Sequence, residues 1–327
     1  MEKKICVVGG GRWGRNHIRE LFQMGCLGGI VEKDAVRLKE LADTYPVKAF
    51  TSLENALITG FDGYIVATPA ETHYEIGKTL IDHGQNVLIE KPMTLQSSQA
   101  RELASLSHRK KTRLMVGHIL LFHPAMRKIK ELIVRGRLGQ LYYMYSTRLN
   151  LGTVRTEENV FWSFAPHDIS VMNYLTGSLP VGVCALGGKF LQGTLEDVTV
   201  THLEYPDNIR AHIFVSWLHP FKEQRLVVVG SEGMISFEDS SPDKNIMLYN
   251  KRIQMADGIP RKIEQPDEVI PYDRTPPLRK ELEYFIEGLD ARITVADGWS
   301  GAEVVRILEQ AQKCLSNAPS AAVINSH

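Results

Sequence analysis

The chain of 327 residues has little of what marks several protein classes. Its four cysteines are scattered and form no C-x-x-C pair, which argues against a disulfide framework or a metal site. Its 38 basic residues equal its 38 acidic residues, which removes any bulk electrostatic case for binding nucleic acid or a membrane surface. No apolar run reaches the roughly 18 residues that a transmembrane helix needs.

The composition and the first residues complete this outline. A hydrophobic fraction of 43% and a charged fraction of 23% are typical of a soluble globular protein. The chain enters a strand directly, without the apolar segment and cleavage site of a signal peptide, so we expect a cytoplasmic protein with reduced cysteines. The length predicts two domains.

The stretch CVVGGGRWGRNH shows what is present. KICVV at residues 4–8 predicts a buried strand, and Gly9, Gly11 and Gly14 fit the pattern G-x-G-x-x-G before a helix over residues 13–24. Glycines there allow a tight turn, the approach of a pyrophosphate to the backbone, and close packing of the helix. The helix N-terminus supplies free N–H groups for the phosphate.

An acidic residue follows at the expected place. Residues 26–32 predict a second strand that ends at Glu32, close to the spacing of about 20 residues at which an acid binds the adenosine ribose. A carboxylate accepts hydrogen bonds from both ribose hydroxyls and repels a 2′-phosphate. We therefore expect NAD as the cofactor, although a plain strand-end acid is the alternative.

Strands and helices alternate through the rest of the first domain. Strands are predicted at residues 63–69, 86–92 and 112–119, with helices between them, which predicts a parallel sheet with right-handed crossovers. Ligands of such sheets bind beyond the carboxyl ends of the strands. Lys91 lies in one of these loops, where an ammonium can stabilise a developing alkoxide. The alternative is a solvated loop lysine.

Several segments resemble the glucose–fructose oxidoreductase / inositol dehydrogenase family, written Gfo/Idh/MocA. They are GGGRWGRNH, VATPAETH, IEKPMTL, SFAPHD, VVVGSEGMISF and PPLRKELEYFIEGL, in order along almost the whole chain. The resemblance implies an α/β Rossmann domain followed by an α+β domain with a large open mixed sheet. It also implies that Lys91 and His167 are catalytic. The predicted cofactor-binding residues are Gly9, Gly11, Arg12, Trp13, Gly14, Glu32, Thr68, Pro69, His73, Glu90 and Lys91.

We place the domain boundary near residue 120, giving a Rossmann domain over 1–120 and a substrate-binding and oligomerisation domain over 121–327. A helix links them, and β-rich runs follow at residues 141–150, 197–205, 208–217, 223–230 and 233–238. Residues 240–275 are polar and predict one strand flanked by loops. A closing helix at about 299–315 is expected to pack back on the first domain. The family often uses the sheet for self-association, which implies a homodimer or homotetramer.

His167 precedes a helix predicted over residues 168–175. A histidine at a helix start favours its neutral form, which suits a general base near pH 7. The family often has an acid four positions earlier, where this chain has Ser163, so any role of that acid is in doubt. Asp168 either caps the helix or contacts the substrate. The predicted substrate-binding residues are Arg148, Asn150, Arg155, Asn159, Trp162 and Asp168.

Three functions remain open. The first is NAD-dependent oxidation of a sugar hydroxyl, at C3 of a UDP-N-acetylhexosamine or its uronate, because this segment resembles that subgroup and arginines bind phosphates. The second is oxidation of a free polyol or monosaccharide such as an inositol. The third is a nicotinamide-binding regulator without turnover, which the presence of both Lys91 and His167 disfavours. Either of these two residues can take the hydroxyl proton.

Overall fold

A computed structural model describes residues 3–317 and divides the chain into two compact units. The first unit comprises Met1–Pro124 and Arg274–Arg306, and the second comprises Ala125–Asp273 and Ile307–His327. The first break lies close to the predicted boundary near residue 120. The segment 274–306 belongs to the first unit, whereas the sequence placed all of it after that boundary.

The first unit holds a six-stranded parallel sheet with the order β3-β2-β1-β4-β5-β6. This order is that of the doubly wound dinucleotide-binding fold, as the sequence predicts. Every residue of β1, β4, β5 and β6 is buried, and nearly all are apolar, which is typical of strands covered on both faces. The strands are β1 (Ile5–Val8), β2 (Leu27–Val31), β3 (Lys48–Phe50), β4 (Gly63–Val66), β5 (Val87–Glu90) and β6 (Leu114–Gly117).

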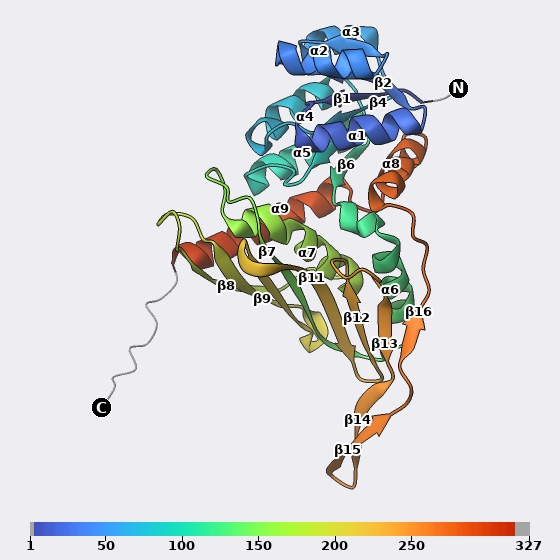
Figure 1. Cartoon of the computed structure of the whole chain (residues 1–327), viewed down its shortest axis with the longest axis vertical. Helices are drawn as coiled ribbons and strands as arrows, with labels where there is room; N and C mark the ends of the chain where they lie inside the picture. The colour runs from blue at the N-terminus through green and yellow to red at the C-terminus, as the bar shows by residue number, and fades with distance from the viewer. Residues whose placement is uncertain (1–2, 318–327) are drawn as a thin grey trace. The chain divides into compact units, whose positions relative to one another are not determined.

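Helices flank this sheet (Figure 1). They are α1 (Arg12–Gln23), α2 (Ala35–Thr44), α3 (Leu53–Thr59), α4 (His73–Asp82), α5 (Ser97–Lys110) and α8 (Pro277–Gly288), with 3₁₀ turns η1 (Ala70–Thr72) and η2 (Ile119–Phe122). Helix α8 joins this unit from the far end of the sequence and packs against α1 and η2. The helix α9 (Gly298–Ser316), predicted at about 299–315, begins in the first unit and ends in the second.

The second unit is built on an eight-stranded mixed sheet with the order β16-β13-β12-β11-β7-β10-β9-β8. Helix α7 (Val160–Thr176) packs against β7, β9 and β10, and Met144, Leu203 and Ile213 are buried on that covered face. Its strands are β7 (Leu141–Leu151), β8 (Gly182–Gly188), β9 (Val198–Glu204), β10 (Arg210–Ser216), β11 (Leu218–Gly230), β12 (Met234–Glu238), β13 (Ile246–Tyr249) and β16 (Glu268–Ile270). The linking helix is α6 (Pro124–Val134), and η3 (Pro206–Asn208) joins β9 to β10.

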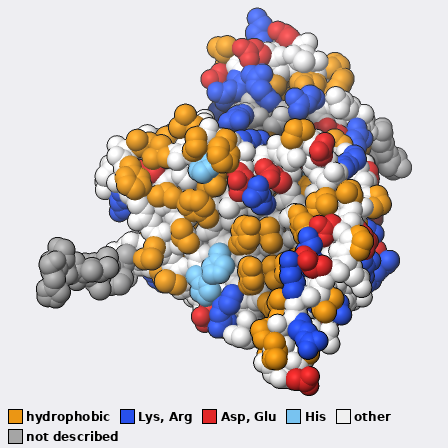
Figure 2. All heavy atoms as spheres, turned by 60° about the horizontal axis from the view of Figure 1, so that its bottom comes forward, with side chains coloured by type: hydrophobic (Ala, Val, Ile, Leu, Met, Phe, Trp, Pro, Cys, Tyr) orange, Lys and Arg blue, Asp and Glu red, His pale blue; other side chains and the backbone are white. Residues whose placement is uncertain are grey.

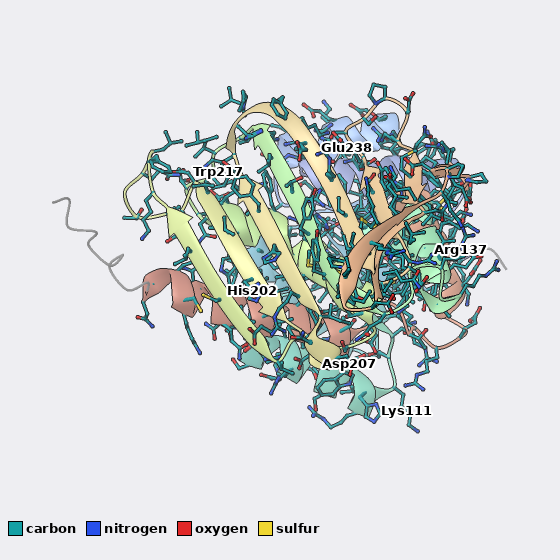
Figure 3. The ribbon with its side chains drawn as sticks, turned by 90° about the horizontal axis from the view of Figure 1, so that it is seen from below. Lys111, Arg137, His202, Asp207, Trp217 and Glu238 are labelled. Atoms are coloured by element: carbon teal, nitrogen blue, oxygen red, sulfur yellow. The ribbon has the colours of Figure 1, made fainter. Side chains whose placement is uncertain are left out.

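The opposite face of this sheet, which we call the open face, carries residues of the alternate register. Figure 3 shows the open face, with His202 on it. Hydrophobic side chains and histidines gather on it (Figure 2). Its exposed apolar side chains include Tyr143, Leu186, Val200 and Val269. In residues 3–317, no helix is both long enough and apolar enough to cross a membrane.

Two predictions for this unit were wrong. Residues 240–275 hold four strands instead of one, namely β13, β14 (Lys251–Ala256), β15 (Ile259–Glu264) and β16. The hairpin β14–β15 is mostly exposed on both faces, so it lacks the apolar alternation that marks a strand. Helix α7 begins at Val160 rather than after His167, with Pro166 inside it.

Candidate active site

The glycine-rich turn of the first unit has the geometry of a phosphate cradle. Gly9 has a φ of 98°, and a Cβ on Gly14 would collide with the Gly9 carbonyl oxygen. A Cβ on Gly11 would meet nothing within 4 Å, because the turn opens there. Gly11 is the N-cap of α1 and supplies no side-chain cap, so the first N–H groups of the helix face this opening without one.

Two exposed side chains begin α1. Arg12 and Trp13 are both exposed at the first turn, as cofactor-binding side chains would be before the cofactor arrives. Neither is held by the core, and Trp13 makes an edge contact with the His17 ring. Their assignment to the cofactor stays a prediction.

Glu32 lies beside this turn and is buried. Its Oε2 accepts from the Gly10 N–H at 2.8 Å and from Arg37 Nη1 at 3.1 Å, and its Oε1 accepts from the Asp34 N–H at 2.9 Å. Burial opposes ionisation, but these hydrogen bonds outweigh it and lower the pKa of Glu32. A fixed carboxylate beside the glycines fits the predicted ribose site.

His73 joins two of the predicted rim loops. Its Nε2 lies 2.8 Å from the Thr68 carbonyl oxygen and its Nδ1 lies 2.8 Å from the Pro92 carbonyl oxygen, with the ring almost fully buried. Burial lowers the pKa of His73 even though both carbonyls favour its charged form. The histidine was predicted to bind cofactor, but its ring atoms are used in holding the loops after β4 and β5 together. In the loop after β4, the predicted cofactor-binding residue Thr68 is partly exposed and Pro69 is exposed.

Glu90 is the last residue of β5, and Lys91 follows it at the carboxyl edge of the sheet. Glu90 is buried, and its Oε1 lies 2.7 Å from His17 Nε2, while its Oε2 accepts from the Lys91 backbone N–H at 3.1 Å. Lys91 is partly exposed. A Cβ on Gly117 would lie 3.0 Å from the Glu90 carboxylate, so β6 packs closely against this side chain. The buried Glu90 carboxylate therefore holds the backbone of Lys91 in place.

Next to Gly117, His118 is buried with both ring nitrogens unpartnered among the described residues. Burial, together with the positive charge of Lys91, lowers the pKa of His118 to about 3. This histidine is therefore neutral at physiological pH.

In the second unit, Arg148 and Asp168 form a paired ion bridge. Arg148 Nε and Nη2 lie 3.1 and 3.2 Å from the two Asp168 carboxylate oxygens, and both side chains are mostly buried. The bridge joins β7 to α7. Asp168 lies inside α7, so the prediction that it caps this helix is wrong. Its partner Arg148 already has a carboxylate, which leaves it less able to hold a substrate phosphate.

His167 lies in the middle of α7 and is partly exposed. The predicted effect of a helix start on its charge is therefore wrong, because the first turn of α7 lies at Val160. Ser163 lies one turn before His167 on the same face of the helix and is buried.

Asn159 is the N-cap of α7. Its Oδ1 accepts from the Trp162 N–H at 3.1 Å, and its Nδ2 donates to Glu196 at 2.6 Å and to Gln312 at 2.9 Å. The side chain is buried. These contacts account for all its polar atoms, so they support a structural cap and give no support to the predicted substrate role.

The other predicted substrate residues differ in their surroundings. Arg155 is exposed and pairs with Glu157 at 3.2 Å and Glu158 at 3.3 Å. Asn150 has a buried Oδ1 with no hydrogen-bond partner among the described residues, so it can accept from a ligand. Trp162 is partly exposed on the first turn of α7.

Comparison with known protein families shows to which family this protein belongs. A family model described as "Oxidoreductase family, NAD-binding Rossmann fold" (GFO_IDH_MocA) matches residues 3–118, and the model of the family's C-terminal domain matches residues 126–236. The chain belongs to the GFO/IDH/MocA oxidoreductase family. It is thus an oxidoreductase with an NAD-binding Rossmann fold.

Among family members, a UDP-N-acetylglucosamine 3-dehydrogenase of Acidithiobacillus ferrooxidans is 26% identical over 91% of this chain and 93% of its own. Inositol 2-dehydrogenases of Corynebacterium glutamicum (strain R) and Rhizobium meliloti (strain 1021) are 27% and 24% identical over 55% and 74% of this chain. These matches cover 56% and 77% of those enzymes.

Solved structures share the fold. The structure of that A. ferrooxidans enzyme, GnnA, superimposes with a TM-score of 0.85 at 24% identity, covering 96% of this chain and 98% of the other. GenD2 from gentamicin A biosynthesis, solved in complex with NAD, gives a TM-score of 0.82 at 22% identity, covering 98% and 96%. At these identities the likeness concerns the fold of the family.

Proposed function

We propose that this chain is an NAD-dependent dehydrogenase that oxidises C3 of a UDP-N-acetylhexosamine or its uronate to a 3-keto sugar. The observation that carries this choice is the match to a UDP-N-acetylglucosamine 3-dehydrogenase over 91% of the chain, against 55% and 74% for the inositol dehydrogenases. Arg155 and Asn150 supply an exposed cation and a buried acceptor in the second unit. An arginine suits the diphosphate of a UDP-sugar, and an amide oxygen suits the N–H of its N-acetyl group.

In this reaction the C3 hydride passes to the nicotinamide of NAD, and the hydroxyl proton passes to a base. His167 is the proposed base, and the Lys91 ammonium stabilises the developing oxyanion. The two residues can exchange these roles. In the first unit, Glu32 would hold the ribose hydroxyls, and the turn at Gly11 with the start of α1 would hold the pyrophosphate.

The direct test follows NADH absorbance during turnover with NAD and each of UDP-N-acetylglucosamine, its uronate, and free inositol. We expect turnover with a UDP-sugar. Turnover with inositol alone would replace the nucleotide-sugar assignment by the polyol alternative. Lys91→Ala and His167→Ala should each lower kcat by about 10²–10⁴-fold while still binding NADH, because each removes a positioned acid–base group.

A second test addresses the nucleotide. UDP should inhibit the wild-type enzyme competitively, and Arg155→Ala should raise KM for the UDP-sugar roughly ten- to a hundred-fold, as expected for one charged hydrogen bond. Arg135→Ala is the matched control, because Arg135 is an exposed arginine in the same unit that pairs with Glu131. Failure of UDP to inhibit would contradict the nucleotide-sugar substrate.

We also propose that the chain forms a homodimer or homotetramer through the open face and is cytoplasmic. Exposed apolar side chains such as Leu186 and Val200 on neighbouring strands support the first part. Val200→Glu should then dissociate the oligomer in sedimentation experiments without unfolding it. A wild-type monomer at micromolar concentration would contradict this proposal.

A further inference from the structure

A group of buried ionisable side chains lies behind Lys91 in the first unit. His17 comes from α1, Glu90 from the end of β5 and Glu281 from α8. His17 and Glu281 are fully buried, and Glu90 is 5% exposed. Charged residues are almost never buried this completely unless they are paired. The proposed chemistry gives a role to Lys91 but none to His17, Glu90 or Glu281, so these three side chains need an account of their own.

Part of the group is already bonded. His17 Nε2 lies 2.7 Å from Glu90 Oε1, and Glu90 Oε2 accepts from the Lys91 N–H. Gly117 leaves just enough room for the Glu90 carboxylate. The orientation of Glu90 is therefore set on one side by His17 and on the other by the backbone of the residue proposed to act on the substrate.

The rest of the group lacks partners. Among the described residues, His17 Nδ1 and both carboxyl oxygens of Glu281 make no hydrogen bond. Leaving a buried polar group unpaired costs about 1–3 kcal/mol, so native proteins rarely do so without a water or a functional reason. Helix α8 packs against α1, which brings the elements that carry Glu281 and His17 together.

The missing bonds are complementary. Burial raises the pKa of Glu281 well above its ordinary 4.5, and the negative charge of Glu90 raises it further, which favours the protonated carboxyl with an O–H to donate. A neutral imidazole that donates from Nε2 to Glu90 accepts at Nδ1. The buried group therefore contains a donor without an acceptor and an acceptor without a donor.

We propose that Glu281, His17 and Glu90 form one hydrogen-bonded chain, in which the Glu281 O–H donates to His17 Nδ1 directly or through one buried water. Glu281 is thereby a positioning residue for Lys91, a role that rests on the proposed function. The chain holds the Glu90 carboxylate under the Lys91 N–H. Other ionisable groups nearby are Lys91, the neutral His118 that feels the charge of Lys91, and the buried His73 that feels the charge of Glu90.

Two variants separate positioning from plain structural support. Glu281→Gln keeps a donor of the same shape and should keep a kcat close to that of the wild type. Glu281→Leu keeps the bulk but removes the donor, and should lower kcat about ten- to a hundred-fold with little change in NADH affinity. Its melting temperature should fall, because the buried His17 Nδ1 loses its donor, so kcat is compared at temperatures where the variant is folded.

The matched control is Glu20→Gln. Glu20 pairs with Arg279 at 2.7 Å and so also joins α1 to α8, but it lies outside the chain of hydrogen bonds. This variant should leave kcat unchanged. If Glu281→Leu kept wild-type kcat, or if Glu281→Gln lost as much as Glu281→Leu, the positioning role would be overturned.

A readout without substrate keeps this inference separate from the proposed function. Infrared difference spectra of the wild type and Glu281→Gln at neutral pH should show a protonated carboxyl band in the wild type alone. The ¹⁵N shifts of His17 should show a protonated Nε2 and a hydrogen-bonded Nδ1. Absence of the carboxyl band would overturn the proposed hydrogen-bonded chain. Presence of the band without turnover on any sugar would overturn only the proposed function.

Discussion

Single residues of the glycine-rich turn are glycine for different physical reasons. At Gly14 the reason is packing within the protein, because any Cβ would collide with the Gly9 carbonyl. At Gly11 the protein itself leaves the space free. The space at Gly11 is the one that the pyrophosphate of a bound dinucleotide would use.

This difference predicts opposite effects of the same substitution. Gly14→Ala should destabilise the protein strongly, because backbone must move to admit the methyl group. Gly11→Ala should leave the melting temperature nearly unchanged and weaken NADH binding. Thermal melts and fluorescence titration of NADH measure the two effects. Equal NADH affinity in Gly11→Ala and wild type would contradict the phosphate cradle.

Glu32 is the residue that we propose selects NAD over NADP. Glu32→Ser removes the carboxylate that would face a 2′-phosphate and leaves Arg37 beside the site, so the NADPH-to-NADH affinity ratio should rise roughly ten- to a hundred-fold. The exposed Glu40, which pairs with Arg15, offers the control Glu40→Ser. A wild type that binds NADPH more tightly than NADH would refute the assigned role.

Elements with strong apolar patterns were predictable from the sequence, and those without them were not. The buried strands β1, β4 and β5 and the glycine turn follow from local apolar runs and turn chemistry. The sequence does not predict the exposed strand β3, because Phe50 is its only residue that is partly buried. Glu281 was also missed, although a charge on the same helical stripe as the buried Phe285 was the available signal.

At helix α7, an element that the sequence predicts only in part led to wrong roles for site residues. Its first turn was hidden because Pro166 normally ends a helix, so Asn159 was assigned to substrate rather than to a cap. The pairing of Arg148 with Asp168 was also beyond the sequence, because it depends on how α7 packs on β7. Residue types at the site were predictable, while their partners required the tertiary structure.

The cap is open to experiment. Asn159→Ala should lower the free energy of unfolding by about 1–3 kcal/mol, because it removes the cap and leaves the buried Glu196 without its amide donor. Asn159→Ser keeps a cap and should lose less. In both variants KM for the substrate should stay unchanged at temperatures where they are folded. A selective rise in KM would restore the substrate role.

The stability of the whole molecule depends on pH through its buried ionisable groups, and two of them act in opposite directions. Folded His118 stays neutral down to a pKa of about 3, whereas the unfolded chain takes up this proton below about 6.5. The unfolded state therefore binds more protons as pH falls, and His118 makes the protein less stable in acid. Folded Glu281 keeps a proton that the unfolded chain releases above its ordinary pKa of 4.5, so it makes the protein less stable as pH rises.

Urea unfolding of the wild type, His118→Gln and Glu281→Gln between about pH 5 and pH 8 separates the two contributions. Relative to His118→Gln, the wild type should lose up to about 1.4 kcal/mol per pH unit below about 6.5. Relative to Glu281→Gln, it should lose stability with rising pH instead, by up to the same amount per unit, until the folded-state pKa of Glu281 is passed. Because both variants carry an uncharged amide, each difference reports one proton. Parallel curves for the wild type and Glu281→Gln would show that Glu281 ionises in the folded protein, and the hydrogen-bonded chain behind Lys91 would then lack its donor.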